Sequence, residues 1–175
     1  AVFSLRWADP SSVCIITSLS AYYVPTVVFT GAQELGLDAV MVRAFTASDS
    51  AGTSVTLGTG SGRVRSGMGN SLVTDMRIAS TTLLTAGTGT ADANAIVAGS
   101  GAVNVVNAAA GTAYVNPGGG EIPFGFRWEA NIARGEHPIV LQSNEGLRVR
   151  NTVVFPAAGT ATLIVNLSWV EATTY

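Results

Sequence analysis

The sequence has 175 residues, of which 47 % are apolar and 11 % are charged, with a formal net charge of -2. An ordinary soluble domain has roughly 25 % charged residues, so this chain has few of the charged side chains that normally make a protein surface soluble. All nine basic residues are arginine, and they are scattered rather than gathered into the basic stripe typical of nucleic-acid binding. We therefore expect neighbouring protein to cover part of the surface, and we expect no nucleic-acid partner.

The length suits one β-sandwich with a core of its own, so we expect a single domain over residues 1–175. No apolar run approaches the roughly 20 residues that a membrane-spanning helix needs, because Gly, Ser, Thr and Pro interrupt each of them. We therefore expect no membrane partner.

Short strand-like segments separated by turn residues recur along the chain, and helical periodicity is nearly absent. In chain order, the expected strands are 2–7, 13–23, 37–47, 75–80, 94–98, 121–129, 138–142, 146–155 and 160–171. The last is the clearest, because Leu163, Val165, Leu167 and Trp169 alternate with Thr, Ile, Asn and Ser. We expect it to form a hairpin with the strand before it. The pattern predicts an all-β fold, an antiparallel β-sandwich of the jelly-roll type.

Two stretches rich in small residues, 48–69 and 81–120, interrupt this pattern and are expected to form extended loops. Neither can bury much apolar area by itself, so ordering them as free loops would be costly. They are either linkers or arms that become ordered against a neighbouring subunit. Because they contain Val and Ile but little charge, we favour arms.

No combination of residues in the sequence points to catalysis, a cofactor or a metal. His137 is the only histidine, which leaves no pair of histidines for a metal site. Cys14 lies in an apolar, strand-like run, where a small buried side chain is expected rather than a nucleophile. The glycine-rich run 58–62 lacks the ending and the following helix of a phosphate-binding loop. We therefore expect a protein that is not an enzyme, with no cofactor and no metal.

Several polar side chains are candidate contacts with a protein partner. Arg148 and Arg150 lie two apart on one strand and so share a face, where Glu136 and Glu145 are possible ion-pair partners within the domain or across a subunit boundary. The last residue of the sequence is aromatic and follows two threonines, a position from which it can anchor on a partner. The candidate partner-contact residues are Arg63, Arg65, Arg148, Arg150 and Tyr175.

Five segments carry a resemblance to a known family: FTGAQELGLD (29–38), VRAFTASD (42–49), GNSLVTDMR (69–77), GEHP (135–138) and NEGLRVRN (144–151). With the Ala-Gly-Thr turn and the Trp-containing last strand, they resemble small virion proteins of tailed bacteriophages, of the jelly-roll decoration (cement) type. The resemblance implies a protein on the outer surface of the head that clamps neighbouring major capsid proteins. It implies a homotrimer, or less readily a dimer, at symmetry axes, and no binding residue is carried over.

Capsid decoration is therefore the leading functional hypothesis. The alternatives are another virion role, such as a head-fibre base, a tail protein or a minor capsid protein, and a carbohydrate-binding β-sandwich. The carbohydrate hypothesis requires Tyr22, Tyr23 or Trp128 to lie exposed and coplanar in a groove.

Overall fold

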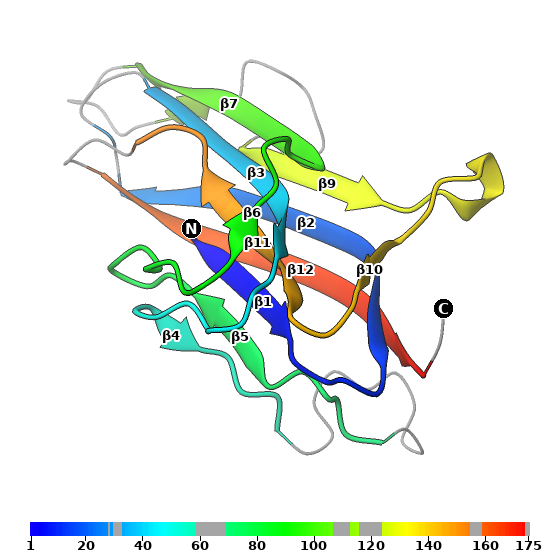
Figure 1. Ribbon diagram of the computed structural model, residues 1–175. Coiled ribbons are helices and arrows are strands. Elements are labelled where there is room, and N and C mark those ends of the chain that lie inside the picture. Colours follow the sequence, from blue (N-terminus) through cyan, green and yellow to red (C-terminus); the bar gives the residue numbers. More distant parts are fainter. Residues whose placement is uncertain are drawn as a thin grey trace.

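The computed structural model describes residues 1–27, 29, 33–58, 69–106, 113–115, 124–154 and 159–173 (Figure 1). These residues form twelve strands and one short 3₁₀ turn, with no α-helix among them. The expected all-β fold is confirmed. The elements are β1 (Phe3–Trp7), β2 (Val13–Val27), β3 (Gln33–Arg43), β4 (Thr53–Ser54), β5 (Asp75–Ile78), β6 (Thr90–Ala91), β7 (Val97–Val106), β8 (Ala113–Val115), β9 (Gly125–Glu129), η1 (Ile132–Arg134), β10 (Ile139–Leu141), β11 (Glu145–Asn151) and β12 (Thr160–Ala172).

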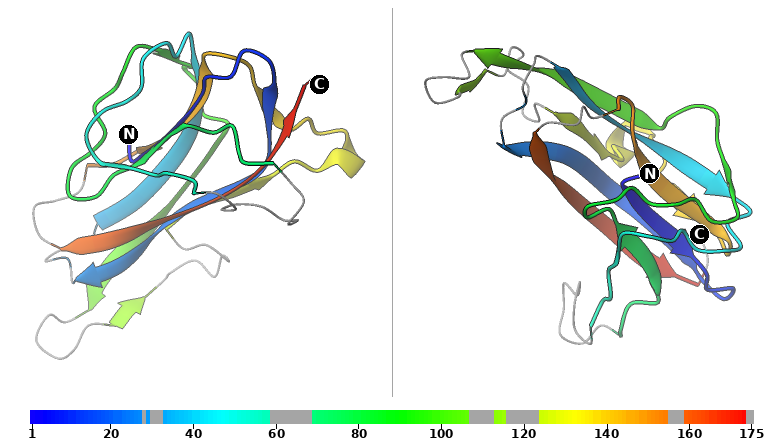
Figure 2. Two further views of the ribbon diagram at one scale, coloured as in Figure 1. Left: turned by 90° about the horizontal axis from the view of Figure 1, so that it is seen from below. Right: turned by 90° about the vertical axis from the view of Figure 1, so that its left-hand side faces the viewer.

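The strands form two antiparallel sheets packed as a sandwich (Figure 2). The large sheet has the order β4-β5-β1-β11-β3-β7-β8, with β6 paired to the end of β3. In the small sheet, β9 and β10 pair with one side of β2 and β12 pairs with the other. The chain changes sheet between β1, β2 and β3 and again between β10, β11 and β12, as in Greek-key and jelly-roll sandwiches.

The expected hairpin of the last two strands is wrong. β11 pairs with β1 and β3 in the large sheet, whereas β12 pairs with β2 in the small sheet. The connection between them therefore crosses from one sheet to the other. The physical reason is burial. In two facing sheets, β11 and β12 both turn their apolar side chains into the core between the sheets. As neighbours in one hairpin, the two strands would lie side by side and could not pack against each other across the core.

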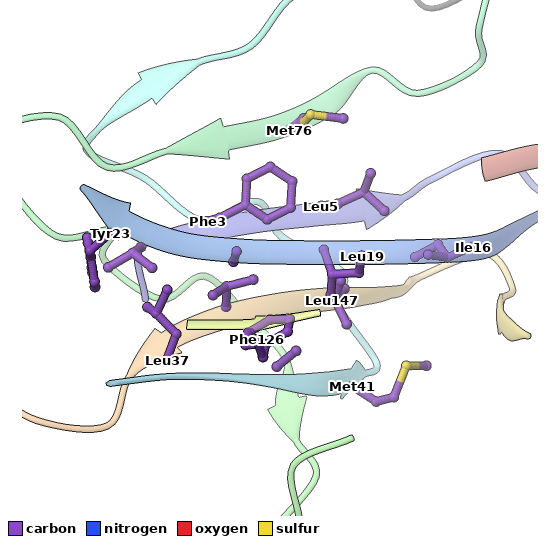
Figure 3. Close-up of a cluster of buried hydrophobic side chains, with 14 of the residues drawn as sticks. Phe3, Leu5, Ile16, Leu19, Tyr23, Leu37, Met41, Met76, Phe126 and Leu147 are labelled. Carbon is purple, nitrogen blue, oxygen red and sulfur yellow. The ribbon is translucent and has the colours of Figure 1, made fainter. Parts of the chain in front are cut away.

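The core lies between the two sheets and takes side chains from both (Figure 3). Leu5 and Leu147 lie directly opposite each other on β1 and β11, and both are fully buried. From the small sheet, Ile16, Leu19 and Tyr23 of β2 point inward to meet them. Alternation along each strand therefore places one apolar face of each sheet in the core.

A second buried layer covers the outer face of the large sheet. Val40 and Val42 of β3 point away from the core and are nevertheless fully buried, because the segments after β3 and β5 fold over them. Phe45 and Leu84 from these segments are buried as well. Reciprocal backbone hydrogen bonds between Ser50 and Thr85, of 2.9 and 3.0 Å, join the two covering segments. The middle of the large sheet, at β3 and β11, is thus covered on both faces by its own chain.

Small residues allow the two sheets to approach closely where β7 lies against β9. A Cβ at Gly99 of β7 would lie 2.0 Å from the carbonyl oxygen of Gly125 in the other sheet. Within the small sheet, a Cβ at Gly125 would lie 1.9 Å from the carbonyl oxygen of Ala21 on β2. The stretch 81–120, which was expected to form an extended loop, contains three strands of the large sheet: β6, β7 and β8. Residues 59–68, 107–112 and 116–123 of the two expected loops lie outside the described residues.

We expect Gly99→Ala to lower the free energy of unfolding by about 1–3 kcal/mol, because the added methyl group collides with the backbone of β9. The matched control is Gly69→Ala, since an added Cβ at Gly69 meets no atom within 4 Å. Urea denaturation of both variants measures the difference. Equal stabilities would show that β7 and β9 do not pack as closely as described.

Candidate interaction surfaces

Arg148 is buried in the covering layer and is held there by a carboxylate and an aromatic ring. Its Nε and Nη2 atoms donate to the two carboxylate oxygens of Asp49 at 2.9 and 2.5 Å, and its side chain is only 7 % exposed. Its guanidinium lies 4.7 Å from the ring centroid of Phe45. Asp49 also accepts a hydrogen bond from the backbone of Gly87, at 2.8 Å. The guanidinium predicted to contact a partner is thus already bound within the chain.

Arg150 lies two residues further along β11 and is paired across the sheet. Its Nε and Nη2 atoms donate to the two carboxylate oxygens of Asp38, on the neighbouring strand β3, at 2.9 and 2.6 Å. These hydrogen bonds raise the pKa of the Arg150 guanidinium. The sequence placed both arginines on one face correctly, but their partners are Asp49 and Asp38, not the Glu136 and Glu145 that the sequence suggested.

Arg6 and Arg43 are neutralised in the same way. Arg6 pairs with Asp75 directly across from it, at 2.7 Å. Arg43 pairs with Glu145 at 2.6 Å and with Asp92 at 3.4 Å, and the hydrogen bond to Glu145, followed by that to Asp92, raises its pKa. These two guanidinium groups therefore already have carboxylate partners within the chain. Arg63, Arg65 and Tyr175 lie outside the described residues, so their contact with a partner stays a prediction.

Cys14 and His137 do not form part of a cluster of chemically reactive side chains in the described ranges. Cys14 is fully buried in β2, as the sequence predicted, and His137 is exposed before β10. Within the described ranges, no three His, Cys, Asp or Glu side chains come close enough to hold a metal ion. No helix in the same part of the chain is long and apolar enough to cross a membrane.

β12 is a long strand at the edge of the small sheet. It pairs with β2 along thirteen residues, and no backbone group elsewhere in the described ranges bonds to its other side. The other edge strands, β4, β8, β9 and β10, have two to five residues each. Since short edge strands are a common protection against unwanted pairing, β12 is the edge that the described chain leaves open.

The pairing of β12 with β2 also leaves β12 regular. The register shifts twice, and each time the extra residue belongs to β2: Thr17 near one end and Thr26 near the other. Their hydroxyls donate to the β12 carbonyls of Ser168 and Thr160, both at 3.3 Å. The bulges therefore bend the central strand and leave an uninterrupted ladder of backbone groups along the open edge.

The outer face of the small sheet is neutral. Its charged residues in the described ranges, Arg127 and Glu129, form a pair with each other at 3.2 Å. The remaining outward side chains are apolar or carry a hydroxyl or amide. They are Ile15, Ser18, Ser20, Tyr22, Val24, Val140, Thr162, Ile164, Asn166, Ser168 and Val170. Val24 and Val170 are 40 % and 53 % exposed, so this face presents apolar area to its surroundings.

A pocket of about 650 Å³ opens between the sheets at the start of β12. Its lining includes Val2, Leu163 and the exposed side chains of Leu83 and Val154, and no charged side chain. Inside it, the buried Tyr23 hydroxyl donates a hydrogen bond to the side chain of Asn151, and burial raises the pKa of this tyrosine. The pocket is thus suited to apolar groups.

The three aromatic residues required by the carbohydrate hypothesis do not share a face. Tyr23 is buried in the core, and Trp128 packs partly buried against it. Tyr22 points to the outer face, because neighbouring residues of a strand lie on opposite sides of the sheet. No flat aromatic platform is formed by these three side chains.

Comparison with known protein families, with curated proteins and with solved structures gave no match to this chain. The class of protein is therefore defined by its own geometry, as an all-β protein with two antiparallel sheets packed as a sandwich.

We expect Arg148→Met to lower the free energy of unfolding by about 3–5 kcal/mol, because it leaves the buried Asp49 carboxylate without its cation. The control is Arg127→Met, which removes an exposed ion pair and should cost at most about 1 kcal/mol. Chemical denaturation of both variants gives the comparison. A loss at Arg148 no larger than that at Arg127 would contradict a buried pair.

The Cys14 thiol gives the stability a pH dependence in the alkaline range. Burial, assisted by the nearby Glu171 carboxylate, raises its pKa from 9.0 to about 12. The unfolded chain therefore ionises first, so stability is full below pH 9 and is lost as the pH rises from 9 towards 12. Between about pH 8 and about pH 10, we expect the wild type to lose about 1.4 kcal/mol more than Cys14→Ala. Urea midpoints at the two pH values test this, and equal losses would contradict it.

Proposed function

We propose that this protein is a structural virion component, a decoration (cement) protein. It binds the outer surface of a tailed-phage head and stabilises contacts between major capsid proteins. The observation that carries the proposal is the neutral surface of the small sheet, formed by its outer face and the open edge of β12. The resemblance of five sequence segments to phage decoration proteins supplies the specific role.

The chemistry of this surface suits contact with another protein. Burying a charge without a partner is costly, whereas hydroxyl and amide groups can be buried whenever they find hydrogen bonds. The ion pairs of Arg6, Arg43, Arg148 and Arg150 lie within the chain, so binding a neighbour leaves them intact. A stable contact needs about 1,600 Å² of buried surface, and repetition by the symmetry of a head multiplies the effect of each contact.

The mechanism of stabilisation follows from the position of such a protein. A rigid sandwich placed across the joint between two capsid subunits must lose its contacts before the joint can open. Its binding free energy therefore adds to that of the joint and opposes the outward pressure of packaged DNA.

Electron microscopy of virions from the phage that encodes this chain tests the proposal. We expect density for the sandwich on the outer surface of the head, in regular positions over the joints between major capsid proteins. Heads that lack the chain should release their DNA at a lower temperature, and adding back the purified protein should restore the wild-type temperature. Density confined to the tail, or the absence of the chain from purified virions, would overturn the proposal.

A further inference from the structure

From Thr160 to Val170, β12 carries none of the charges, prolines or bulges that usually prevent an edge strand from pairing with another chain. It contains no proline and no lysine, and the bulges beside it belong to β2. Its charged residue is Glu171, near the end of the strand. The Glu171 carboxylate accepts hydrogen bonds from Ser71, from the backbone of Leu72 and from Trp169, at 2.6 to 3.1 Å. This charge is therefore turned towards its own chain.

The uncharged part of the strand, Thr160–Val170, matches a reversed copy of itself. Two antiparallel copies can be aligned about a twofold axis at Val165. Each core-facing residue of one copy then lies opposite a core-facing residue of the other copy. The inward pairs are then Ala161 with Trp169, and Leu163 with Leu167. These inward side chains are only half-buried in the single chain, so a second copy would cover them further.

The outward side of the strand matches in the same way. In this alignment Thr162 meets Ser168, and Ile164 meets Asn166. No charge opposes a like charge anywhere along the eleven paired residues, whereas a strongly charged partner strand would find no opposite charge to bind. Charge and polarity along the edge thus favour an identical strand over an acidic or basic one.

We propose that two copies of this protein pair through the open edges of β12, antiparallel and about a twofold axis at Val165. The two small sheets then form one continuous sheet across the dimer, and the free N–H and C=O groups of β12 are satisfied by the other copy. A twofold contact of this kind closes on itself and gives a dimer. The inference selects a dimer over the trimer that the family resemblance implies, and it does not depend on the proposed function.

Light scattering and analytical ultracentrifugation of the purified protein give the first test. We expect an equilibrium between a monomer of 17.9 kDa and a species of twice that mass, with a Kd in the micromolar range. A constant mass of one chain at concentrations up to about 100 µM would overturn the inference. A trimer would also overturn it, while leaving the decoration role intact.

Charge-bearing variants test whether β12 forms the contact. Thr162 and Ser168 are exposed on the outer face, so substitution there does not disturb the core. The double variant Thr162→Lys, Ser168→Lys places lysine opposite lysine in the proposed alignment, and the double variant Thr162→Glu, Ser168→Glu does the same with carboxylates. We expect each to weaken self-association by about tenfold or more.

Mixing the two double variants tests directly whether β12 pairs with β12 in the dimer. Lysines on one chain then face glutamates on the other, so native mass spectrometry should detect the mixed dimer far above either pure dimer. The control variant Thr46→Lys, Thr88→Lys alters exposed threonines on the covering layer of the large sheet and should dimerise as the wild type does. Circular dichroism confirms that each variant is folded. No preference for the mixed dimer, or equal weakening by the control, would overturn the pairing through β12.

Discussion

The buried ion pair between Arg148 and Asp49 is the interaction on which the arrangement of surfaces depends. It joins a strand in the middle of the large sheet to a loop 99 residues away, and Phe45 lies against the same guanidinium. Such a pair need not add much stability over apolar packing, but neither partner can be left alone in the interior. The loop must therefore close over the middle of the large sheet, whereas the outer face of the small sheet keeps exposed side chains in the part of the chain that the structure describes.

The sandwich is closed tightly where β7 meets β9 and more loosely near β12. Glycines on facing strands allow backbone to approach backbone on the tight side. On the loose side, the half-buried residues of β12 lie beside a pocket, and the backbone of the strand has an unpaired edge. Low charge, an open edge and incompletely buried apolar side chains thus occur together, as expected of a surface that another protein covers.

Four separate segments of the sequence supply charged residues that hold the large sheet together. Asp38, Asp49, Asp75 and the two arginines of β11 come from these segments, and they form the ion pairs in and around the large sheet. These segments therefore contribute to the stability of the fold. The surface proposed for binding lies mostly outside these segments, on β2 and β12, where no charged or catalytic motif marks it.

The sequence by itself determined the all-β class, the burial of Cys14 and the two faces of β12. These features depend on the alternation and polarity of residues that are neighbours in the sequence. It did not determine that β11 and β12 belong to different sheets, or that Arg148 is buried against Asp49. Those facts depend on contacts between residues far apart in the chain. Only the tertiary structure decided which strand is left at an open edge. A strand is at an edge when no other strand pairs with one of its sides, and the amino-acid pattern of a strand does not show which strands pair with it.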